Sequence, residues 1–524
     1  MNRTLDISRR TALKSGALAL AAGALQSSTS LFGDDDTGPA GLRRVAGIDS
    51  SYYLIPFDEN GRERSWRGTF VSRAVSEQLR DRRISDVFIF SHGWRGDVSD
   101  AISQYDAWVT AMARCAAGIA QLKRTRNDFA PLLVGIHWPS LPFGDEELRS
   151  FQATALGPGR RRSDDERVDL FAERIASSNR ARSALRKILA AADGPSPTSL
   201  PRDIAQAFTD LQREAGLFGG SISTPGADGE LFDPARTYAQ VRAARASGEA
   251  AGFQGADDLN WFLQMLGYFS FWKMKDRARM FGETGAHQLL QSLQRQAAGR
   301  DTRFHLMGHS FGCIVASACI AGPRNARSQP TPVHSLSLVQ GALSLWSYCS
   351  NIEQGISGSP QPVPGGSEGY FRRLIDRRLV SGALVTTQSI YDSAVGELYP
   401  WAAWWGRQVA MATNQYPKYG AIGEYGIHGP GCDAHDLEIQ NAGYSYEFKP
   451  GKIYNLESSS VIRNGTGFSG AHSDICHPEI AHAVWQAASV AVEQNPSPAP
   501  APKPVPKPTD PTRRPLRRLI DRLF

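Results

Sequence analysis

Cysteine is scarce in this chain, with six among 524 residues. The six form no Cys-x-x-Cys pair and no spacing typical of a zinc site, and they are too few for a disulfide-rich scaffold. Cys313 and Cys319 fall in an apolar run, so we expect buried thiols there. A bridge between Cys432 and Cys476 stays open, because both lie in the loop-rich C-terminal third.

Long apolar runs are also missing. Beyond the first 30 residues, no stretch approaches the about 20 apolar residues that a membrane-spanning helix needs. No P-loop or dinucleotide-binding fingerprint occurs, so we expect no nucleotide cofactor and no metal. The 41% hydrophobic content nevertheless excludes a disordered chain.

The part of the chain between its two ends carries no excess of basic residues, although the formal net charge of the whole chain is +6. The first 30 residues carry a net charge of +3 and residues 494–524 carry +5, which leaves −2 for everything between. The body is therefore near neutral. This distribution does not support a nucleic-acid partner, because a phosphate-binding groove needs clustered basic side chains.

The N-terminal segment 1–30 resembles a twin-arginine export signal. Arg9 and Arg10 precede a mildly apolar run from Gly16 to Leu25, and Ala22–Ala24 has the small residues of a cleavage site. The resemblance implies export to the periplasm or the cell exterior. An amphipathic N-terminal helix is the alternative, and no cysteine follows the run to carry a lipid anchor.

The C-terminal segment 494–524 begins as a proline-rich linker. Its last nine residues place leucine, isoleucine and phenylalanine at helical spacing opposite three arginines. Such a basic amphipathic tail could contact an anionic membrane surface or a partner. A frayed tail is equally open, because so short a helix is marginal alone.

Between these ends, residues 31–493 alternate short apolar runs with helical patterns. The pattern predicts one long helix from Asp97 to about Lys123, and a large helical insertion over about 140–262. The predicted strands are Asp86–Phe90, Pro131–His137, Arg303–Met307, Val333–Val339, Ala383–Thr387 and Lys452–Leu456. Buried strands separated by helices indicate an α/β fold with a mostly parallel sheet covered by helices on both faces.

The segment Gly308–Gly312 reads Gly-His-Ser-Phe-Gly and lies between a predicted strand and a helical run. The glycines permit a strained turn that holds Ser310 above the sheet, and the helix that follows points its N-terminus at developing negative charge. Gly365–Gly369 also matches Gly-x-Ser-x-Gly, but no helical run follows it, so we interpret that segment as a loop.

With this motif in place, residues 50–138 and 263–490 resemble the α/β-hydrolase family, in particular its lipase- and esterase-like serine hydrolases. In that family a His-Gly pair after an early strand helps to form the oxyanion hole, and His92 and Gly93 match it. The resemblance implies that the backbone N–H groups of Trp94 and Phe311 hold the oxyanion. The alternative is that Gly93 only turns the chain and that Trp94 packs.

The resemblance also implies a Ser, Asp or Glu, His order of catalytic residues. His472, in a loop after the last predicted strand, is the base we select. Among the other histidines, His309 is expected to pack beside the nucleophile, and the remaining candidates for the base are His477, His482 and His435.

The resemblance places the acid just after the penultimate strand, at 384–387 here, which selects Asp392; an ordinary turn or helix cap is the alternative role for this residue. Glu353 is the rival acid. Asp474 is too close in sequence to His472 to orient it easily, and we expect it to cap the next helix.

These residues predict acyl transfer to water, with Ser310 as nucleophile. The resemblance implies a small or lipid-like ester as substrate. A binding protein that has kept the hydrolase fold without turnover, or an acyltransferase with an acceptor other than water, are the alternatives. Two aromatic clusters could line an acyl pocket or a lid, or pack the insertion onto the body. They are Trp261, Phe262, Phe269, Phe271 and Trp272, and Tyr399, Trp401, Trp404 and Trp405.

Overall fold

The computed structural model describes the part of the chain that carries the sheet and most of the helices around it. The two terminal segments, 1–30 and 494–524, lie outside the described residues. Those residues are 41–58, 60–66, 68–93, 98–140, 163–195, 197–216, 233–235, 237–239, 261–325, 330–392, 416–417, 420–465 and 470–490.

The described residues form a nine-stranded sheet in the order β1-β2-β4-β3-β5-β6-β7-β9-β8. All neighbouring strands are parallel except β1 and β2, which are antiparallel. The strands are β1 (Gly41–Arg44), β2 (Ser51–Pro56), β3 (Asp86–Ser91), β4 (Pro131–His137), β5 (Arg303–His309), β6 (Ser335–Val339), β7 (Leu384–Gln388), β8 (Ala434–Glu438) and β9 (Ile453–Glu457).

The six strands predicted from apolar runs are thus confirmed within two residues at each end. The outer strands β1, β2 and β8 were not predicted. Edge strand β8 reads Ala-His-Asp-Leu-Glu and is mostly exposed, so it has no apolar run to reveal it. Charged side chains on an edge strand also discourage pairing with another chain.

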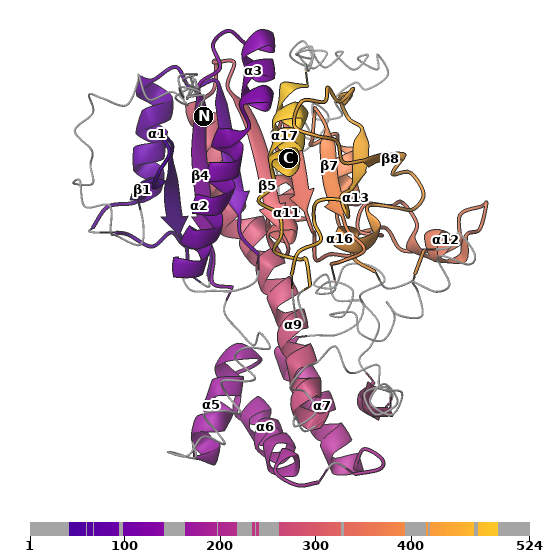
Figure 1. Ribbon diagram of the computed structural model, residues 1–524. Coiled ribbons are helices and arrows are strands. Elements are labelled where there is room, and N and C mark those ends of the chain that lie inside the picture. The colour runs from indigo at the N-terminus through magenta and orange to yellow at the C-terminus, as the bar shows by residue number, and fades with distance from the viewer. Residues whose placement is uncertain are drawn as a thin grey trace, which may run out of the picture. The chain divides into compact units, whose positions relative to one another are not determined.

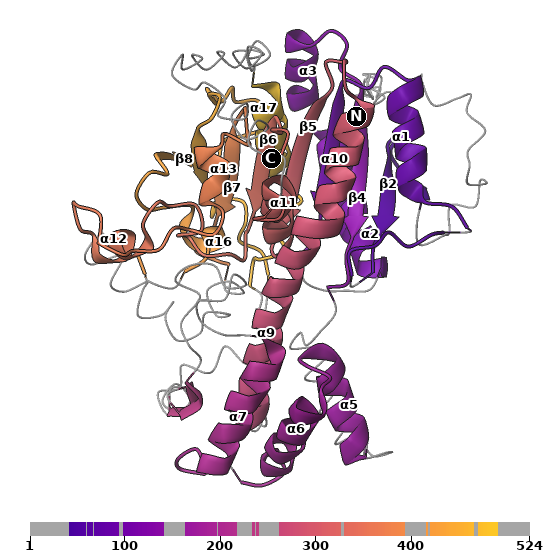
Figure 2. The same ribbon diagram turned by 180° about the vertical axis from the view of Figure 1, so that it is seen from behind.

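Helices cover both faces of the sheet, as expected for an α/β fold (Figures 1 and 2). The central strands are buried on both sides: in β3, Val87 and Ile89 belong to one apolar core and Phe88 and Phe90 to the other. The helices are α1 (Val71–Asp81), α2 (Val98–Arg114), α3 (Ala116–Thr125), α5 (Asp164–Arg174), α6 (Asn179–Ala192), α7 (Arg202–Ala215), α9 (Trp261–Phe281), the π-helix η5 (Gly282–Ala286), α10 (His287–Gln296), α11 (Gly312–Ala321), α12 (Ile352–Ser357), α13 (Arg372–Asp376), α16 (Ile422–Tyr425) and α17 (Pro478–Ser489).

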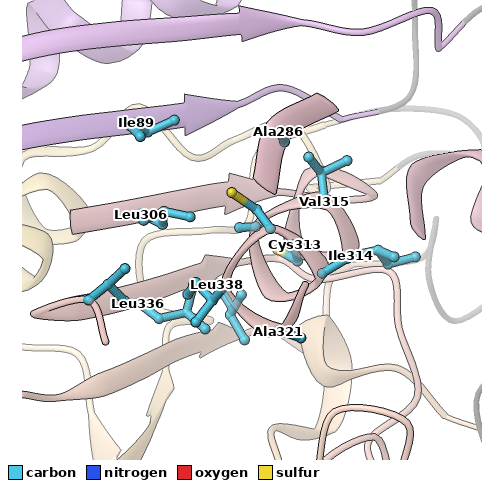
Figure 3. Close-up of a cluster of buried hydrophobic side chains, with 14 of the residues drawn as sticks. Ile89, Ala286, Leu306, Cys313, Ile314, Val315, Ala321, Leu336 and Leu338 are labelled. Atoms are coloured by element: carbon cyan, nitrogen blue, oxygen red, sulfur yellow. The ribbon is translucent and has the colours of Figure 1, made fainter. Parts of the chain in front are cut away.

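The first core lies under α1, α10 and α11, and the second under α2, α3 and α17. Helix α11 is buried along its whole length, and its side chains lie over β3, β5 and β6 (Figure 3). A helix that is apolar all round and fully buried has little freedom to shift. It therefore holds the end of β5 in place.

The single helix predicted from Asp97 to about Lys123 is wrong, because the chain breaks at Cys115. That residue has φ −78° and ψ 69°, outside the helical region, and it separates α2 from α3. Both helices pack against α17, where a β-carbon on Gly118 would lie only 2.7 Å from the Trp485 ring. The apolar pattern does not register such a break, since both helices bury a stripe of side chains.

Between β4 and α9 the described residues are helical and form a separate apolar core. Helices α5, α6 and α7 enclose it together with the first half of α9. The second half of α9 contributes Met274, Ala278 and Phe281 to the core beneath the sheet. One continuous helix thus carries side chains of both cores.

All six cysteines are free, so the bridge between Cys432 and Cys476 that the sequence left open is not formed. Cys432 is buried and its thiol donates to the His428 carbonyl oxygen at 3.4 Å, whereas Cys476 is exposed. Cys313 and Cys319 are buried, as predicted. In the described part of the chain, no helix has the length and apolar character needed to cross a bilayer.

Candidate active site

Ser310 lies at a sharp turn between β5 and α11. Its φ of 57° is in the left-handed region, which a serine adopts at an energetic cost. The Ser310 N–H donates to the Val339 carbonyl oxygen at 3.2 Å, and the Ser310 carbonyl oxygen accepts from the N–H of Ala342 at 3.2 Å. Val339 ends β6 and Ala342 lies in the loop just after it, so the neighbouring strand and its loop hold the strained residue.

The turn is so tight that its two flanking glycines cannot carry a side chain. A β-carbon on Gly308 would collide with the Gly312 carbonyl group, and one on Gly312 would collide with the Ser91 carbonyl oxygen. Helix α11 begins directly at Gly312, with Phe311 at its N-cap. In the first turn of α11, the N–H of Cys313 donates to the Ser310 carbonyl oxygen at 3.1 Å and the N–H of Ile314 donates to the Phe311 carbonyl oxygen at 3.0 Å, so the start of the helix is joined directly to the Ser310 turn.

The structure brings Ser310, His472 and Asp392 into one hydrogen-bonded chain. The His472 Nε2 lies 2.7 Å from the Ser310 Oγ, and its Nδ1 lies 2.8 Å and 3.0 Å from the two Asp392 carboxylate oxygens. An ionised carboxylate only accepts hydrogen bonds, so the ring proton sits on Nδ1 and Nε2 is the acceptor. Asp392 is fully buried, and Ser310 and His472 are nearly so.

Two loops at the carboxyl ends of β7 and β9 supply the acid and the imidazole. Their backbones are joined directly, because the Ala471 N–H donates to the Tyr391 carbonyl oxygen at 3.0 Å. The Ser389 hydroxyl also crosses between them and donates to the Ile462 carbonyl oxygen at 2.6 Å. Asp392 and His472 are therefore held as one unit.

His309 packs beside Ser310, as the sequence predicted, and it also supports the loop of His472. Its Nε2–H donates to the His472 carbonyl oxygen at 2.9 Å, which leaves Nδ1 to accept from the Gln104 amide on α2. The two imidazole rings lie 5.0 Å apart. Sequence reasoning missed Gln104, because no motif connects this α2 residue with the strand of Ser310.

His92 and Gly93 follow β3 and lie against the Ser310 turn. The His92 Nδ1–H donates to the Gly93 carbonyl oxygen at 2.9 Å, and Nε2 accepts from the Trp138 N–H at 3.3 Å. Burial lowers the pKa of His92 to about 3, so its ring is neutral and fixed in this tautomer. Trp94 lies outside the described residues; of the two expected oxyanion donors, the structure describes Phe311.

Gln340 was missed by sequence reasoning and lies in contact with the expected acid. Its Nε2 donates to the Asp392 Oδ2 at 2.7 Å and to the Gly423 carbonyl oxygen at 3.0 Å. The residue is fully buried and has φ 46°. Its position directly after an apolar strand, like that of Ser310 after β5, was the signal that could have found it.

The other candidate histidines are used elsewhere. His477 pairs with Asp474 at 2.8 Å, and the His482 Nε2 donates to the Tyr444 carbonyl oxygen at 2.6 Å. His435 lies exposed on β8, where it stacks on the Tyr454 ring.

The rival acid Glu353 accepts from the N–H of Ser367, the serine of the second Gly-x-Ser-x-Gly match, at 2.6 Å. Glu353 lies in the first turn of α12 and Ser367 in the loop that follows, and their contact is exposed. The second match is thus a loop, as expected.

Asp474 does not cap the following helix, which corrects the expectation. Helix α17 has His477 at its N-cap and no side-chain cap bond. Asp474 instead accepts from the backbone N–H groups of Arg463 and Asn464, at 3.1 Å and 2.8 Å. These bonds join residues 463 and 464 to Asp474, on either side of His472 in the sequence, so Asp474 closes the loop that carries His472.

The described aromatic residues of the first cluster pack the insertion. Phe262 stacks on Tyr238 and Phe269 stacks on Phe208, with ring centroids 5.6 Å and 5.9 Å apart, all within the separate helical core. The remaining aromatic residues lie outside the described side chains. They are Trp261, Phe271 and Trp272, and the cluster of Tyr399, Trp401, Trp404 and Trp405.

A second Ser–His–Asp chain occurs at the opposite end of the sheet and is entirely buried. The His305 Nε2–H donates to Asp86 at 3.0 Å, and its Nδ1 accepts from the Ser335 hydroxyl at 2.8 Å. Each of the three residues is at most 2% exposed, and none lies at a helix N-terminus. The three residue types alone therefore do not define a reactive site.

Comparison with known proteins gives no relative: no family model, no curated protein and no solved structure matches this chain. Among the described residues, no three His, Cys, Asp or Glu side chains gather as a metal site would require.

Proposed function

We propose that this protein is a serine hydrolase of the α/β-hydrolase fold that cleaves carboxylic esters in an esterase- or lipase-like reaction. The observation that carries the proposal is the chain from Ser310 through His472 to Asp392, joined by hydrogen bonds of 2.7 Å and 2.8 Å. The strained turn between β5 and α11 adds support, because it presents the hydroxyl at the N-terminus of a helix.

The chemistry follows from the direction of these bonds. His472 removes the Ser310 proton through Nε2, and the serine oxygen attacks the ester carbonyl carbon. Asp392 holds the imidazole and stabilises it once it is protonated. His472 then gives the proton to the departing alcohol, and water releases the acyl group by the same steps in reverse. No cofactor is needed for this reaction.

The carbonyl oxygen becomes negatively charged when the serine attacks. We propose that the backbone N–H groups of Phe311 and Trp94 hold it. A donor fixed in this place contributes about 3 kcal/mol, since it favours the transition state over the bound ester. The close packing of Gly93 against Ser310 supports this role, because it brings the start of the loop containing Trp94 to the nucleophile.

Labelling with a fluorophosphonate probe tests the nucleophile. Wild type should be labelled, Ser310→Ala should not, and Ser367→Ala, the matched change in the second motif, should be labelled like wild type. Circular dichroism melts check that each variant is folded. Labelling of folded Ser310→Ala at the wild-type rate would reject Ser310 as nucleophile.

A series of p-nitrophenyl esters of increasing acyl length, with and without added alcohols, tests the reaction. Release of nitrophenol in water supports an esterase, and faster release with formation of a new ester supports an acyltransferase. Binding without turnover would indicate a protein that has kept the hydrolase fold for recognition.

The location of the protein is also a proposal. The resemblance of residues 1–30 to a twin-arginine signal supports export to the periplasm or the cell exterior. Retention in the cytoplasm after Arg9 and Arg10 are both changed to lysine, with export of the unchanged chain, is the expected result.

A further inference from the structure

The buried side-chain amide of Gln340 contacts the Asp392 carboxylate, which binds His472. The role inferred for this amide rests on the proposed function. Gln340 directly follows β6, and Thr387 and Asp392 belong to β7 and the loop after it. Gln340 is 47 positions from Thr387 and 52 positions from Asp392 in the sequence. The structure assigns Gln340 as a positioning residue that sets the orientation of Asp392, with Thr387 fixing the direction of its amide.

The direction of the Gln340 amide follows from the hydrogen bonds of Thr387. The Thr387 Oγ1 accepts from the Gln340 backbone N–H at 3.0 Å, so its own hydroxyl proton remains to be donated. That proton goes to the Gln340 Oε1, 2.8 Å away. The amide oxygen must therefore face Thr387, and the NH₂ group must face Asp392.

Both protons of the NH₂ group are used. One goes to the Asp392 Oδ2 at 2.7 Å and the other to the Gly423 carbonyl oxygen at 3.0 Å. Reversing the amide would place its oxygen against two acceptors. It would also place its NH₂ group against the Thr387 hydroxyl, which already accepts from the Gln340 N–H and would lose the acceptor of its own proton. In a fully buried site such an arrangement is costly, so the amide has one orientation.

The backbone supports the same conclusion. Gln340 has φ 46°, a strained conformation for a residue with a side chain, and a β-carbon on Gly423 would lie 2.8 Å from the Gln340 carbonyl carbon. The strain and the close packing aim the side chain at Asp392. Because Oδ2 is also the carboxylate oxygen nearest to His472 Nδ1, Gln340 and the imidazole bind the same atom.

Without the Gln340 donor, Asp392 loses one of the hydrogen bonds that orient it toward His472, and the imidazole is then held less well toward Ser310. Ester binding does not involve the amide. Loss of Gln340 should therefore lower kcat while leaving KM close to the wild-type value.

The first test uses Gln340→Met, which keeps the side-chain length without the donor. We expect kcat on a p-nitrophenyl ester to fall about 10–100-fold, as it does for outer partners of metal-bound histidines, with KM within about twofold. Gln340→Glu should instead move the acid side of the kcat/KM profile to higher pH by about one unit. A second carboxylate beside Asp392 favours the protonated imidazole, which cannot act as base.

A pair of neighbouring threonines provides the matched control. Thr387→Val removes the hydroxyl that orients the amide, and it should lower kcat. Thr386→Val is equally buried, but the Thr386 hydroxyl donates to the Leu338 carbonyl oxygen, away from Asp392. This control should lower the melting temperature without lowering kcat.

The outcomes separate this inference from the proposed function. If Ser310 is labelled and required in wild type while Gln340→Met and Thr387→Val keep wild-type kcat and pH profile, the positioning role is overturned and the proposed function stands. If the two threonine variants lose kcat equally, the role is also overturned, because general destabilisation explains both. Should wild type show neither labelling nor turnover, the proposed function and the inference both fail.

Discussion

Gly93 lies directly against Ser310: a β-carbon built on Gly93 would come 2.6 Å from the Ser310 β-carbon and 3.1 Å from the His309 carbonyl oxygen. Real β-carbons do not approach another carbon atom so closely. The absence of a side chain at position 93 is therefore what allows the loop after β3 to touch the turn after β5.

Gly93→Ala should strongly reduce the reactivity of Ser310. The added methyl group must push the loop or the serine aside, and a misplacement of about 1 Å can cost about 100-fold in rate. Overpacking should lower the free energy of unfolding by about 1–3 kcal/mol. Rates of fluorophosphonate labelling and urea unfolding curves measure the two effects.

Gly194→Ala is the control for this change, because the nearest atom to its β-carbon would be a carbonyl oxygen at 3.7 Å, an ordinary contact. Equal labelling of wild type and Gly93→Ala would contradict the close packing.

Asp392→Asn should lower kcat by about 10⁴-fold. An asparagine at this position replaces one carboxylate oxygen beside His472 Nδ1 with an NH₂ group, which donates instead of accepting, and it favours the tautomer of His472 that carries its proton on Nε2. That tautomer cannot take the Ser310 proton. Steady-state hydrolysis of a p-nitrophenyl ester measures the loss.

The rival carboxylate supplies the control for Asp392→Asn. Glu353→Gln should leave kcat unchanged, because Glu353 bonds to the exposed loop at Ser367. A rate for Asp392→Asn above one tenth of wild type would argue against Asp392 as the acid.

The free energy of unfolding should fall as the pH drops below about 6.5. Burial lowers the pKa of His92 and of His334 to about 3, and burial also lowers the pKa of His305. The unfolded chain binds protons at its ordinary histidine pKa near 6.5, whereas the folded chain does not, so acid favours unfolding. The stabilisation of the folded chain by its neutral, buried histidines is complete above about pH 6.5 and is lost progressively toward pH 3.

At pH 5 the loss from His92 alone is about 2 kcal/mol. Urea unfolding at pH 7.5 and pH 5 measures it, and His92→Gln should reduce the difference between the two values by about that amount. The exposed His435 is the control, since His435→Gln should leave the difference as in wild type. Equal free energies of unfolding at both pH values in wild type would contradict the buried, neutral state of these histidines.

The sequence by itself determined the class of the fold and the place of the proposed nucleophile. Six buried strands were found because a parallel sheet covered on both faces requires continuous apolar runs, such as the one at 86–90. Ser310 was found because a strand, a small-residue turn and a helix follow one another locally. Asp392 and His472 were chosen because each follows a predicted strand, in the order that the resemblance to the α/β-hydrolase family implies.

Only the tertiary structure decided which polar groups meet. Gln340, Thr387 and Asp392 converge because strands β6 and β7 are neighbours, and Gln104 reaches His309 from a helix 205 positions away in the sequence. The buried chain of Ser335, His305 and Asp86 has the same residue types as the proposed active site but no helix N-terminus. The difference between the two is set by position in the folded sheet. Hydrogen bonds act over about 3 Å in space, and a linear pattern records only distance along the chain.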